Sequence, residues 1–191
     1  MSTIFPESVT RGAGNQPLSG LILGIDPGLQ RTGYALLAGK GGARDARLIE
    51  AGVVRLQRNQ PLGERLVDLE TNLAALIHDH RPTVLACEEL YSHYKHPRTA
   101  ILMGHARGVI LALAARSGLE IVSVAATNAK KLLTGSGRAS KRQVQLAVAA
   151  LLGLAEIPEP NDVADAIAVG LCGLQLRHAA GAIEDAGRFS Q

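Results

Sequence analysis

The sequence predicts a mixed α/β domain, in which a meander of three antiparallel strands is extended by parallel strands and helices cover both faces of the sheet. The chain has 191 residues, of which 47% are hydrophobic, so it is long enough for one domain and too apolar to be disordered throughout. Short apolar runs come first, and later runs alternate with segments of helical periodicity. That order of elements is typical of a mixed sheet between two helical layers.

The strands are predicted from short apolar runs bounded by turn residues. The first run ends at Pro27-Gly28, and a loop at 39–43 separates the second run from the third. Connections this short join neighbouring antiparallel strands. The five predicted strands span residues 21–26, 33–38, 47–56, 83–87 and 120–124.

The helices are predicted where apolar residues recur at helical spacing. Residues 61–80 follow this spacing up to Pro82, and Ser140 is a typical N-cap for a later helix. The predicted helices span residues 61–80, 98–117, 127–133, 141–152 and 161–177. We therefore expect one domain at 20–177, with a flexible N-terminal tail at 1–19 and a C-terminal tail at 178–191.

Composition excludes several classes of protein. Cys87 and Cys172 are too few for a disulfide scaffold and form no CxxC metal pair, so we expect reduced core cysteines in a cytoplasmic protein. The first 20 residues lack the apolar segment of a secretory signal, and we expect no membrane span. Aromatic residues make up only 3% of the chain, which argues against binding single strands chiefly by stacking.

Positive charge is concentrated in one part of the sequence. Residues 90–155 contain nine basic side chains and a single acid, Glu120, which gives this segment a net charge of +8. The whole chain has a net charge of only +3, so the remainder is acidic. A localised basic segment indicates a polyanionic partner such as nucleic acid, although a solvated surface that binds nothing has the same composition.

Four carboxylates occupy positions that favour chemistry. Asp26 and Glu88 end two predicted strands, while Asp162 and Asp165 lie three residues apart at the start of the last predicted helix. An i, i+3 pair shares one helix face, and strand ends meet at one edge of an α/β sheet. The four side chains can therefore converge there.

Four converging carboxylates would suit a pair of divalent cations. Two Mg²⁺ ions prefer oxygen ligands, and their charge of +4 would balance four carboxylates. Such a pair can serve both the attacking and the leaving oxygen when a phosphodiester is hydrolysed. Without cations, repulsion is expected to raise at least one carboxyl pKa.

Each acid also has an ordinary structural explanation. Asp26 can initiate a turn, Asp162 can serve only as a helix N-cap, and Glu88 and Glu89 can be solvated residues beyond a strand. The residues alone do not choose between Glu88 and Glu89. The combination of acids, each next to an apolar element, favours a site over four unrelated roles.

The ordered set of motifs resembles the RuvC family of Holliday-junction resolvases, which have a ribonuclease H-like fold. The resemblance covers residues 21–176. The matching motifs are Leu-Gly-Ile-Asp-Pro-Gly at 23–28, Thr-Gly-Tyr at 32–34, Ala-Cys-Glu-Glu at 86–89, Gly-His-Ala-Arg-Gly at 104–108, Lys-Arg-Gln-Val-Gln at 141–145 and Asp-Val-Ala-Asp-Ala at 162–166.

The resemblance implies a homodimeric endonuclease that cuts four-way DNA junctions by paired, symmetric, Mg²⁺-dependent nicks in recombination and repair. It implies two Mg²⁺ ions per subunit, for which Mn²⁺ can substitute, and cooperation with the RuvA–RuvB branch-migration complex. Matched position by position, the resemblance implies that the catalytic and metal-binding residues are Asp26, Glu88, Asp162 and Asp165. It therefore implies Glu88 rather than Glu89.

Candidate DNA-binding residues come from the basic segment and from a loop after Glu88. Five of them surround Gly135-Ser136-Gly137, a loop that lets main chain approach a phosphate: Lys130, Lys131, Arg138, Lys141 and Arg142. Family members have functional lysines at positions matching Lys130 and Lys141. Tyr91 matches an aromatic position that engages bases near the junction, and Tyr94 is the competing candidate.

Three other functions share part of this pattern. Proteins of the actin and sugar-kinase group also begin with a strand that ends in Asp and Gly, but they need two such domains. A ribonuclease H-like nuclease that acts on ribosomal RNA precursors shares the acids. A junction-binding protein without catalysis shares the basic surface.

Overall fold

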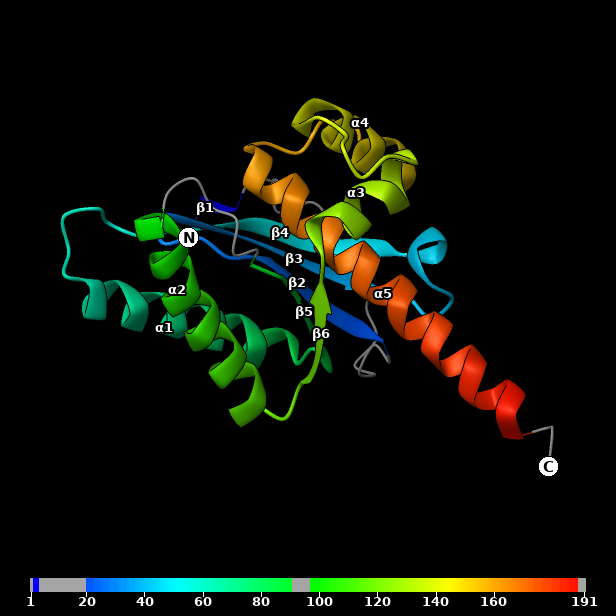
Figure 1. Ribbon diagram of the computed structural model, residues 1–191, viewed down its shortest axis with the longest axis horizontal. Helices are drawn as coiled ribbons and strands as arrows, with labels where there is room; N and C mark the ends of the chain where they lie inside the picture. Colours follow the sequence, from blue (N-terminus) through cyan, green and yellow to red (C-terminus); the bar gives the residue numbers. More distant parts are fainter. Residues whose placement is uncertain (1, 4–19, 91–96, 189–191) are drawn as a thin grey trace.

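A computed structural model describes residues 2–3, 20–90 and 97–188, and its centre is a six-stranded mixed sheet (Figure 1). The strand order is β1-β4-β3-β2-β5-β6. β2, β3 and β4 form the antiparallel meander, while β5 is parallel to β2 and β6 to β5. The strands are β1 (Ser2–Thr3), β2 (Leu21–Asp26), β3 (Arg31–Ala38), β4 (Arg47–Arg55), β5 (Val84–Glu88) and β6 (Glu120–Val124).

This sheet confirms the predicted mixed α/β fold. The five predicted strands occur in the expected arrangement, and β1 adds a two-residue edge strand by pairing with β4. β1 belongs to the segment expected to be a flexible tail at 1–19, and the rest of that tail lies outside the described residues. Edge strands leave main-chain groups unpaired, and β1 satisfies some of those on β4.

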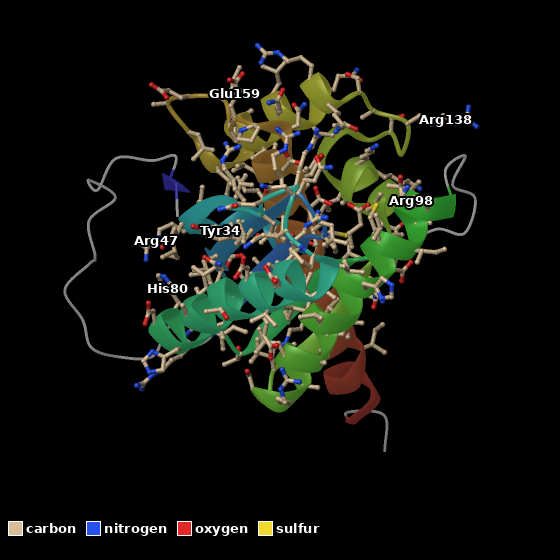
Figure 2. The ribbon with its side chains drawn as sticks, turned by 90° about the vertical axis from the view of Figure 1, so that its left-hand side faces the viewer. Tyr34, Arg47, His80, Arg98, Arg138 and Glu159 are labelled. Carbon is tan, nitrogen blue, oxygen red and sulfur yellow. The ribbon has the colours of Figure 1, made fainter. Side chains whose placement is uncertain are left out.

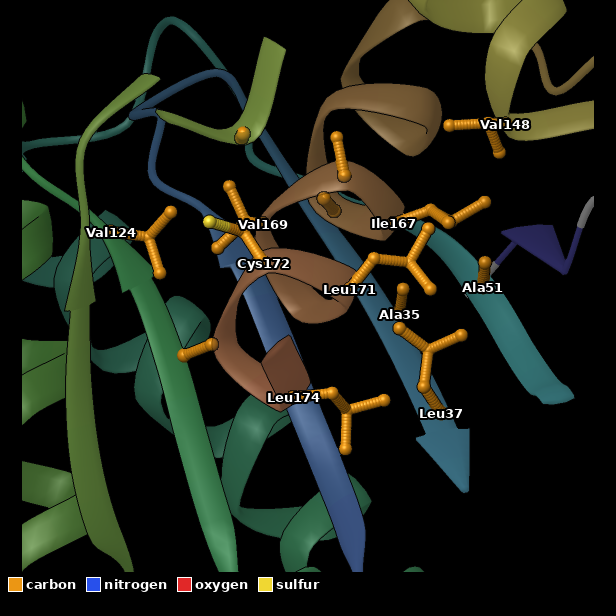
Figure 3. Packing of buried hydrophobic residues seen from close by; sticks show 14 of the residues in the cluster. Ala35, Leu37, Ala51, Val124, Val148, Ile167, Val169, Leu171, Cys172 and Leu174 are labelled. Carbon is orange, nitrogen blue, oxygen red and sulfur yellow. The ribbon is translucent and has the colours of Figure 1, made fainter. Parts of the chain in front are cut away.

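Helices cover both faces of the sheet, as predicted. They are α1 (Leu62–His80), α2 (Pro97–Arg116), α3 (Ala126–Thr134), α4 (Lys141–Leu152) and α5 (Asn161–Arg188), with a 3-10 turn, η1 (Ala43–Asp45). One core cluster joins the sheet to α1 and α2, and the other joins it to α3, α4 and α5. Figure 3 shows the second cluster, in which Ile167 and Leu171 of α5 pack near Ala35 and Leu37 of β3. Cys87 and Cys172 are buried and unpaired with each other, as expected of core thiols.

The amino-terminal half of α5 lies directly against the sheet because glycines remove the side chains between them. A Cβ at Gly33 of β3 would be 1.9 Å from the Asp162 carbonyl oxygen, and one at Gly24 of β2 would be 2.5 Å from that of Ala166. Gly170 of α5 faces Gly24 at the next turn. Main chain therefore packs on main chain at the end of the helix that carries Asp162 and Asp165.

The predicted end of the last helix is wrong. We expected it to end near Arg177, but α5 continues to Arg188 and its far end projects beyond the sheet (Figure 1). The continuation contains four alanines and no proline, so local propensity sustains the helix even where its residues are exposed. Ile183, for example, is 72% exposed.

Two helices meet a length and hydropathy criterion for membrane spans, which differs from the expectation that none would. They are Arg98–Arg116 in α2 and Asn161–Ile183 in α5. Half of the α5 window is buried inside the protein, where it covers the sheet. α2 buries Ala106, Ile110 and Leu113 in the other core cluster. Both helices thus serve as core helices of an α/β domain.

Candidate active site

Asp26 and Glu88 lie side by side at the carboxyl edge of the sheet. Asp26 ends β2, Glu88 ends β5, and these strands pair in parallel up to Ile25 and Cys87. Side chains alternate along a strand, so both acids point to the face that Ile22 and Ala86 share with α5. By the same alternation Glu89 points to the other face, so the structure places Glu88 at this site.

The first turns of α5 add the other two acids. Asp162 and Asp165 lie on the helix end that rests against Gly33, and their side chains are 21% and 22% exposed. The structure therefore brings the four predicted acids together, from two strand ends and one helix. The roles predicted for them stay predictions.

Burial and the crowding of these acids raise the pKa of three of them. Burial, reinforced by the neighbouring carboxylates Glu88, Asp165 and Asp162, raises the pKa of Asp26 to about 8. Burial and Asp165 raise the pKa of Glu88 to about 7. Burial also raises the pKa of Asp165, against the opposing effect of nearby lysines. A carboxylate takes up a proton in this way when neither water nor a cation stabilises its charge.

Basic side chains border the acids on two sides. Arg31 of β3 places its Nε 3.3 Å from Oδ2 of Asp162, and Lys141 of α4 places its Nζ 4.0 Å from Oδ2 of Asp165. Lys130 of α3 also lowers the pKa of Glu88. Two of the predicted DNA-binding lysines thus lie at the acids themselves.

Arg107 of α2 fixes the strand ends from the opposite face of the sheet. Its Nε donates to the Glu88 carbonyl oxygen at 2.9 Å, and its Nη2 donates to Ser123 Oγ of β6 at 3.1 Å. The Glu89 amide donates to the Val124 carbonyl oxygen at 2.9 Å, which extends the β5–β6 pairing past Glu88. The main chain that carries Glu88 is therefore held on both sides.

A family model for the crossover junction endodeoxyribonuclease RuvC matches residues 22–173 of this chain, a range that contains all four acids. The chain belongs to the RuvC family. The RuvC of Rhodopirellula baltica is 50% identical over 152 residues, covering 80% of this chain and 84% of that protein. The RuvC of Caldicellulosiruptor saccharolyticus is 42% identical over 151 residues, covering 79% and 90%.

Solved structures support the same assignment. RuvC of Thermus thermophilus in complex with a Holliday junction substrate has a TM-score of 0.78 and 32% identity, and the match covers 84% of this chain and 96% of that one. The yeast mitochondrial Holliday junction resolvase has a TM-score of 0.57 at 17% identity, which extends the likeness of fold alone. The expected RuvC-type, ribonuclease H-like fold is thus confirmed.

RuvC relatives generally use Mg²⁺, and the oxygen donors of this site suit that ion. No group of three or more Asp, Glu, His or Cys side chains in the described part of the chain is arranged to hold a metal ion as it stands. Asp162 and Asp165 instead face Arg31 and Lys141, an arrangement that repulsion among the carboxylates favours. The oxygen donors of these side chains fit Mg²⁺ in kind.

The remaining candidate DNA-binding residues lie around the α3–α4 loop. Lys131, Arg138 and Arg142 are exposed, and Figure 2 shows Arg138 projecting from the loop into solvent. Ser140 caps α4 as predicted: its hydroxyl accepts from the Gln143 amide at 3.3 Å, and the Gln143 side chain accepts from the Ser140 amide at 2.8 Å. This capping box fixes the start of α4 next to Lys141. Tyr91 and its competitor Tyr94 lie outside the described residues.

Sequence reasoning missed Arg31 and Arg107 as site residues. Arg107 belongs to the Gly-His-Ala-Arg-Gly motif, and nothing in the spacing of that motif indicates that Arg107 reaches the Glu88 carbonyl oxygen. Arg31 lies outside the basic segment. Its one sequence signal is that it comes two residues before Gly33 and so shares a strand face with it.

Proposed function

We propose that this chain resolves four-way DNA junctions as a crossover junction endodeoxyribonuclease, a hydrolase of recombination and repair. The observation that carries the proposal is the convergence of four acids beside a basic surface in a chain of the RuvC family. The Thermus thermophilus relative, 32% identical, has been solved with a Holliday junction substrate. The family match favours this activity over the kinase-like and RNA-directed alternatives.

We propose that Asp26, Glu88, Asp162 and Asp165 hold two Mg²⁺ ions, for which Mn²⁺ can substitute. When bound, the ions supply an activated water and stabilise the leaving oxygen of a phosphodiester. The side chains of the chain do the rest: the carboxylates fix the reacting position at the sheet edge, and Arg107 keeps the main chain of Glu88 in place. Because the four carboxylates are crowded, cation binding also relieves their repulsion.

Basic residues hold the DNA at this position. Lys130 and Lys141 border the acids and attract the phosphate backbone, and three exposed residues extend this surface outward: Lys131, Arg138 and Arg142. Contacts of this kind fix register and orientation rather than base sequence. We assign the base contact near the junction to Tyr91.

We propose that the active form is a homodimer, since a nearly two-fold symmetric junction requires two matched nicks. One face of α2 supports this. It exposes Ile101, at 62%, followed by the small residues Gly104, Gly108, Ala112 and Ala115, and a face of small residues lets a second helix approach closely. We further propose that the protein is cytoplasmic and cooperates with a RuvA–RuvB branch-migration complex.

Cleavage of a labelled four-way junction tests the function directly. Wild type, Asp26→Asn and Asp79→Asn are compared with and without Mg²⁺ on the junction, a matched linear duplex and an RNA hairpin. Asp79 is an exposed carboxylate of α1 and serves as the matched control. We expect paired symmetric nicks in the junction alone, abolished by Asp26→Asn and unchanged by Asp79→Asn, while junction binding persists. Preferred cutting of the RNA, or binding without cleavage, would overturn the proposal.

A further inference from the structure

A second basic cluster lies beside the four acids, outside the basic segment at 90–155. Arg31, Arg55 and Arg58 line a cavity of about 390 Å³ together with Gln30 and Leu56. This cavity, here called the arginine pocket, adjoins the candidate metal site because Arg31 also contacts Asp162. Its residues come from the start of β3 and from the end of β4 and the residues after it.

The sheet register places the arginine pocket on the same edge and face as the acids. Asp26 pairs with Gly33, and two residues further out Arg31 pairs with Arg55. Alternation from Gly33 and Val53 turns both arginines toward the α5 face, as the contact between Arg31 and Asp162 shows. With the strand order β4-β3-β2-β5, Arg55, Arg31, Asp26 and Glu88 follow one another across this edge.

Two of the three arginines that line the pocket have no anionic partner among the described residues, while Arg31 pairs with Asp162. Like charges directly opposite each other on antiparallel strands destabilise a sheet, yet Arg31 and Arg55 hold such a pair of positions. No carboxylate lines the pocket, and among residues 20–90 and 97–188 neither Arg55 nor Arg58 forms an ion pair. Arg55 and Arg58 therefore place two positive charges at one cavity that no carboxylate in the described part of the chain balances.

The pocket is also held in shape. The Leu56 amide donates to the Gln30 carbonyl oxygen at 3.0 Å, and Arg58 Nε donates to Gln30 Oε1 at 2.8 Å, so the two segments are tied together. Arg65 of α1 donates to the Leu29 carbonyl oxygen and anchors the loop that joins β2 to β3. These contacts hold the two segments that carry the pocket arginines, and a guanidinium group offers N–H donors that match the oxygens of a phosphate.

We propose that the arginine pocket binds a backbone phosphate of the DNA strand whose neighbouring phosphodiester lies at the four acids. Arg31 links the two positions, because it borders Asp162 on one side and the pocket on the other. A strand that crosses the acids along the sheet edge therefore meets Arg31, Arg55 and Arg58 next. This inference rests on the proposed function and names a substrate contact within it.

The test measures junction binding as a function of salt concentration in EDTA, using a labelled four-way DNA junction. The variants are Arg55→Gln, Arg58→Gln and the double substitution. Arg47→Gln is the matched control, since Arg47 is an exposed arginine at the opposite end of β4, away from Arg138 in Figure 2. Lys141→Ala, at a lysine beside the acids, is the positive control. Arg31 is left intact because of its contact with Asp162.

Each pocket substitution is expected to reduce the slope of log affinity against log salt by about one, as for one lost phosphate contact. Affinity at moderate salt is expected to fall about tenfold, since a charge-assisted hydrogen bond is lost. In Mg²⁺, KM for junction cleavage should rise while kcat changes little, because the contact is made before and during the reaction. Arg47→Gln should match wild type in every assay.

Unchanged salt slopes in both single variants would overturn the proposal, whatever their cleavage rates. Reduced slopes in a protein that never nicks the junction would support the pocket and overturn the proposed function, so the two failures are distinguishable. Thermal unfolding separates binding from folding: Arg55→Gln removes a like-charge pair and is expected not to lower the Tm. If it does lower the Tm, Arg58→Gln decides, because Arg58 lies outside the strands.

Discussion

Asp26 combines burial with three acidic neighbours, and this makes it costly to keep ionised. The carboxyl ends a strand whose other residues are almost all in the core, so its surroundings offer little solvation. Burial and the neighbouring carboxylates raise its pKa from an ordinary 3.8 to about 8, which reflects that cost. A bound cation would stabilise the ionised form of this carboxyl group. Without a cation, a neutral side chain at position 26 would make the protein more stable than an ionised one.

Stability should therefore depend on pH through Asp26. Between pH 4 and 8 the folded protein holds a proton that the unfolded chain has released, so stability falls as pH rises through this range. The Asp26→Asn variant cannot ionise at this position, so its stability should not fall with pH for this reason. In urea unfolding with EDTA, we expect the variant to gain at least about 1.4 kcal/mol over wild type between pH 5 and pH 8, the value of one pKa unit.

The same samples test metal binding without an activity assay. Mg²⁺ should raise the stability of wild type, because a ligand that binds only the folded state stabilises it, and should do little for Asp26→Asn. Asp79→Asn, an exposed carboxylate of α1, is the control and should follow wild type in both series. An Asp26→Asn variant less stable than wild type at pH 8 would contradict the account of burial and repulsion.

The sequence predicts a site residue when the residue's immediate neighbours in the chain indicate its role. Asp26 and the Asp162–Asp165 pair have local signals, a charge after an apolar strand and an i, i+3 spacing. No local signal distinguishes Glu88 from Glu89. The strand β5 is buried on both faces, so its residues do not alternate between apolar and polar. Arg31 and Arg55 become neighbours only through strand register.

At the scale of elements, the contact between α5 and the sheet sets the distance between the helix acids and the strand acids. Gly33→Ala tests this, because the added Cβ would be 1.9 Å from the Asp162 carbonyl oxygen and must displace the helix. We expect Mg²⁺-dependent junction cleavage to fall about a hundredfold, the effect of a displacement near 1 Å, and stability to fall by about 1–3 kcal/mol.

Gly181→Ala, in the exposed part of the same helix, is the matched control. An added Cβ there meets nothing within 4 Å, and alanine favours helix over glycine by about 1 kcal/mol. This variant should be as stable as wild type or more so, with unchanged cleavage. Full activity in a folded Gly33→Ala protein would show that the main-chain contact does not set the acids.

The elements predicted best were those with a periodic pattern and a clear stop. The helix before Pro82 and the capped start of α4 are examples, since both signals lie within a few residues. The end of α5 was predicted wrongly because no residue near Arg177 stops a helix, and solvent exposure alone does not end one. α2 contributes Ala106, Ile110 and Leu113 to the core and exposes Ile101, and its part in a dimer interface stays a proposal.

At the scale of the whole molecule, the proposed homodimer would use the exposed face of α2. Ile101→Asp should weaken that association, because a charge placed in an apolar interface loses its hydration. In sedimentation experiments we expect a shift from dimer to monomer at micromolar concentration. With the junction as substrate, we expect single nicks to replace paired ones.

Val67→Asp is the control for this prediction. Val67 lies on α1, on the same side of the sheet, and is exposed to nearly the same extent as Ile101, at 60% against 62%. It should leave both the sedimentation and the pairing of nicks unchanged. A dimer that survives Ile101→Asp would place the interface elsewhere on the molecule.

The glycine contacts between α5 and the sheet also bear on how this protein tolerates change. At these glycines the main chain of α5 touches the main chain of the sheet, with no side chain between them. The distance between the strand acids and the helix acids therefore does not depend on which side chains fill the neighbouring core. Replacing Leu37 or Leu171 by another aliphatic residue would then alter the unfolding free energy while the chemistry keeps its geometry. The core residues of this domain can therefore change in sequence while the glycine contacts keep the spacing between the strand acids and the helix acids.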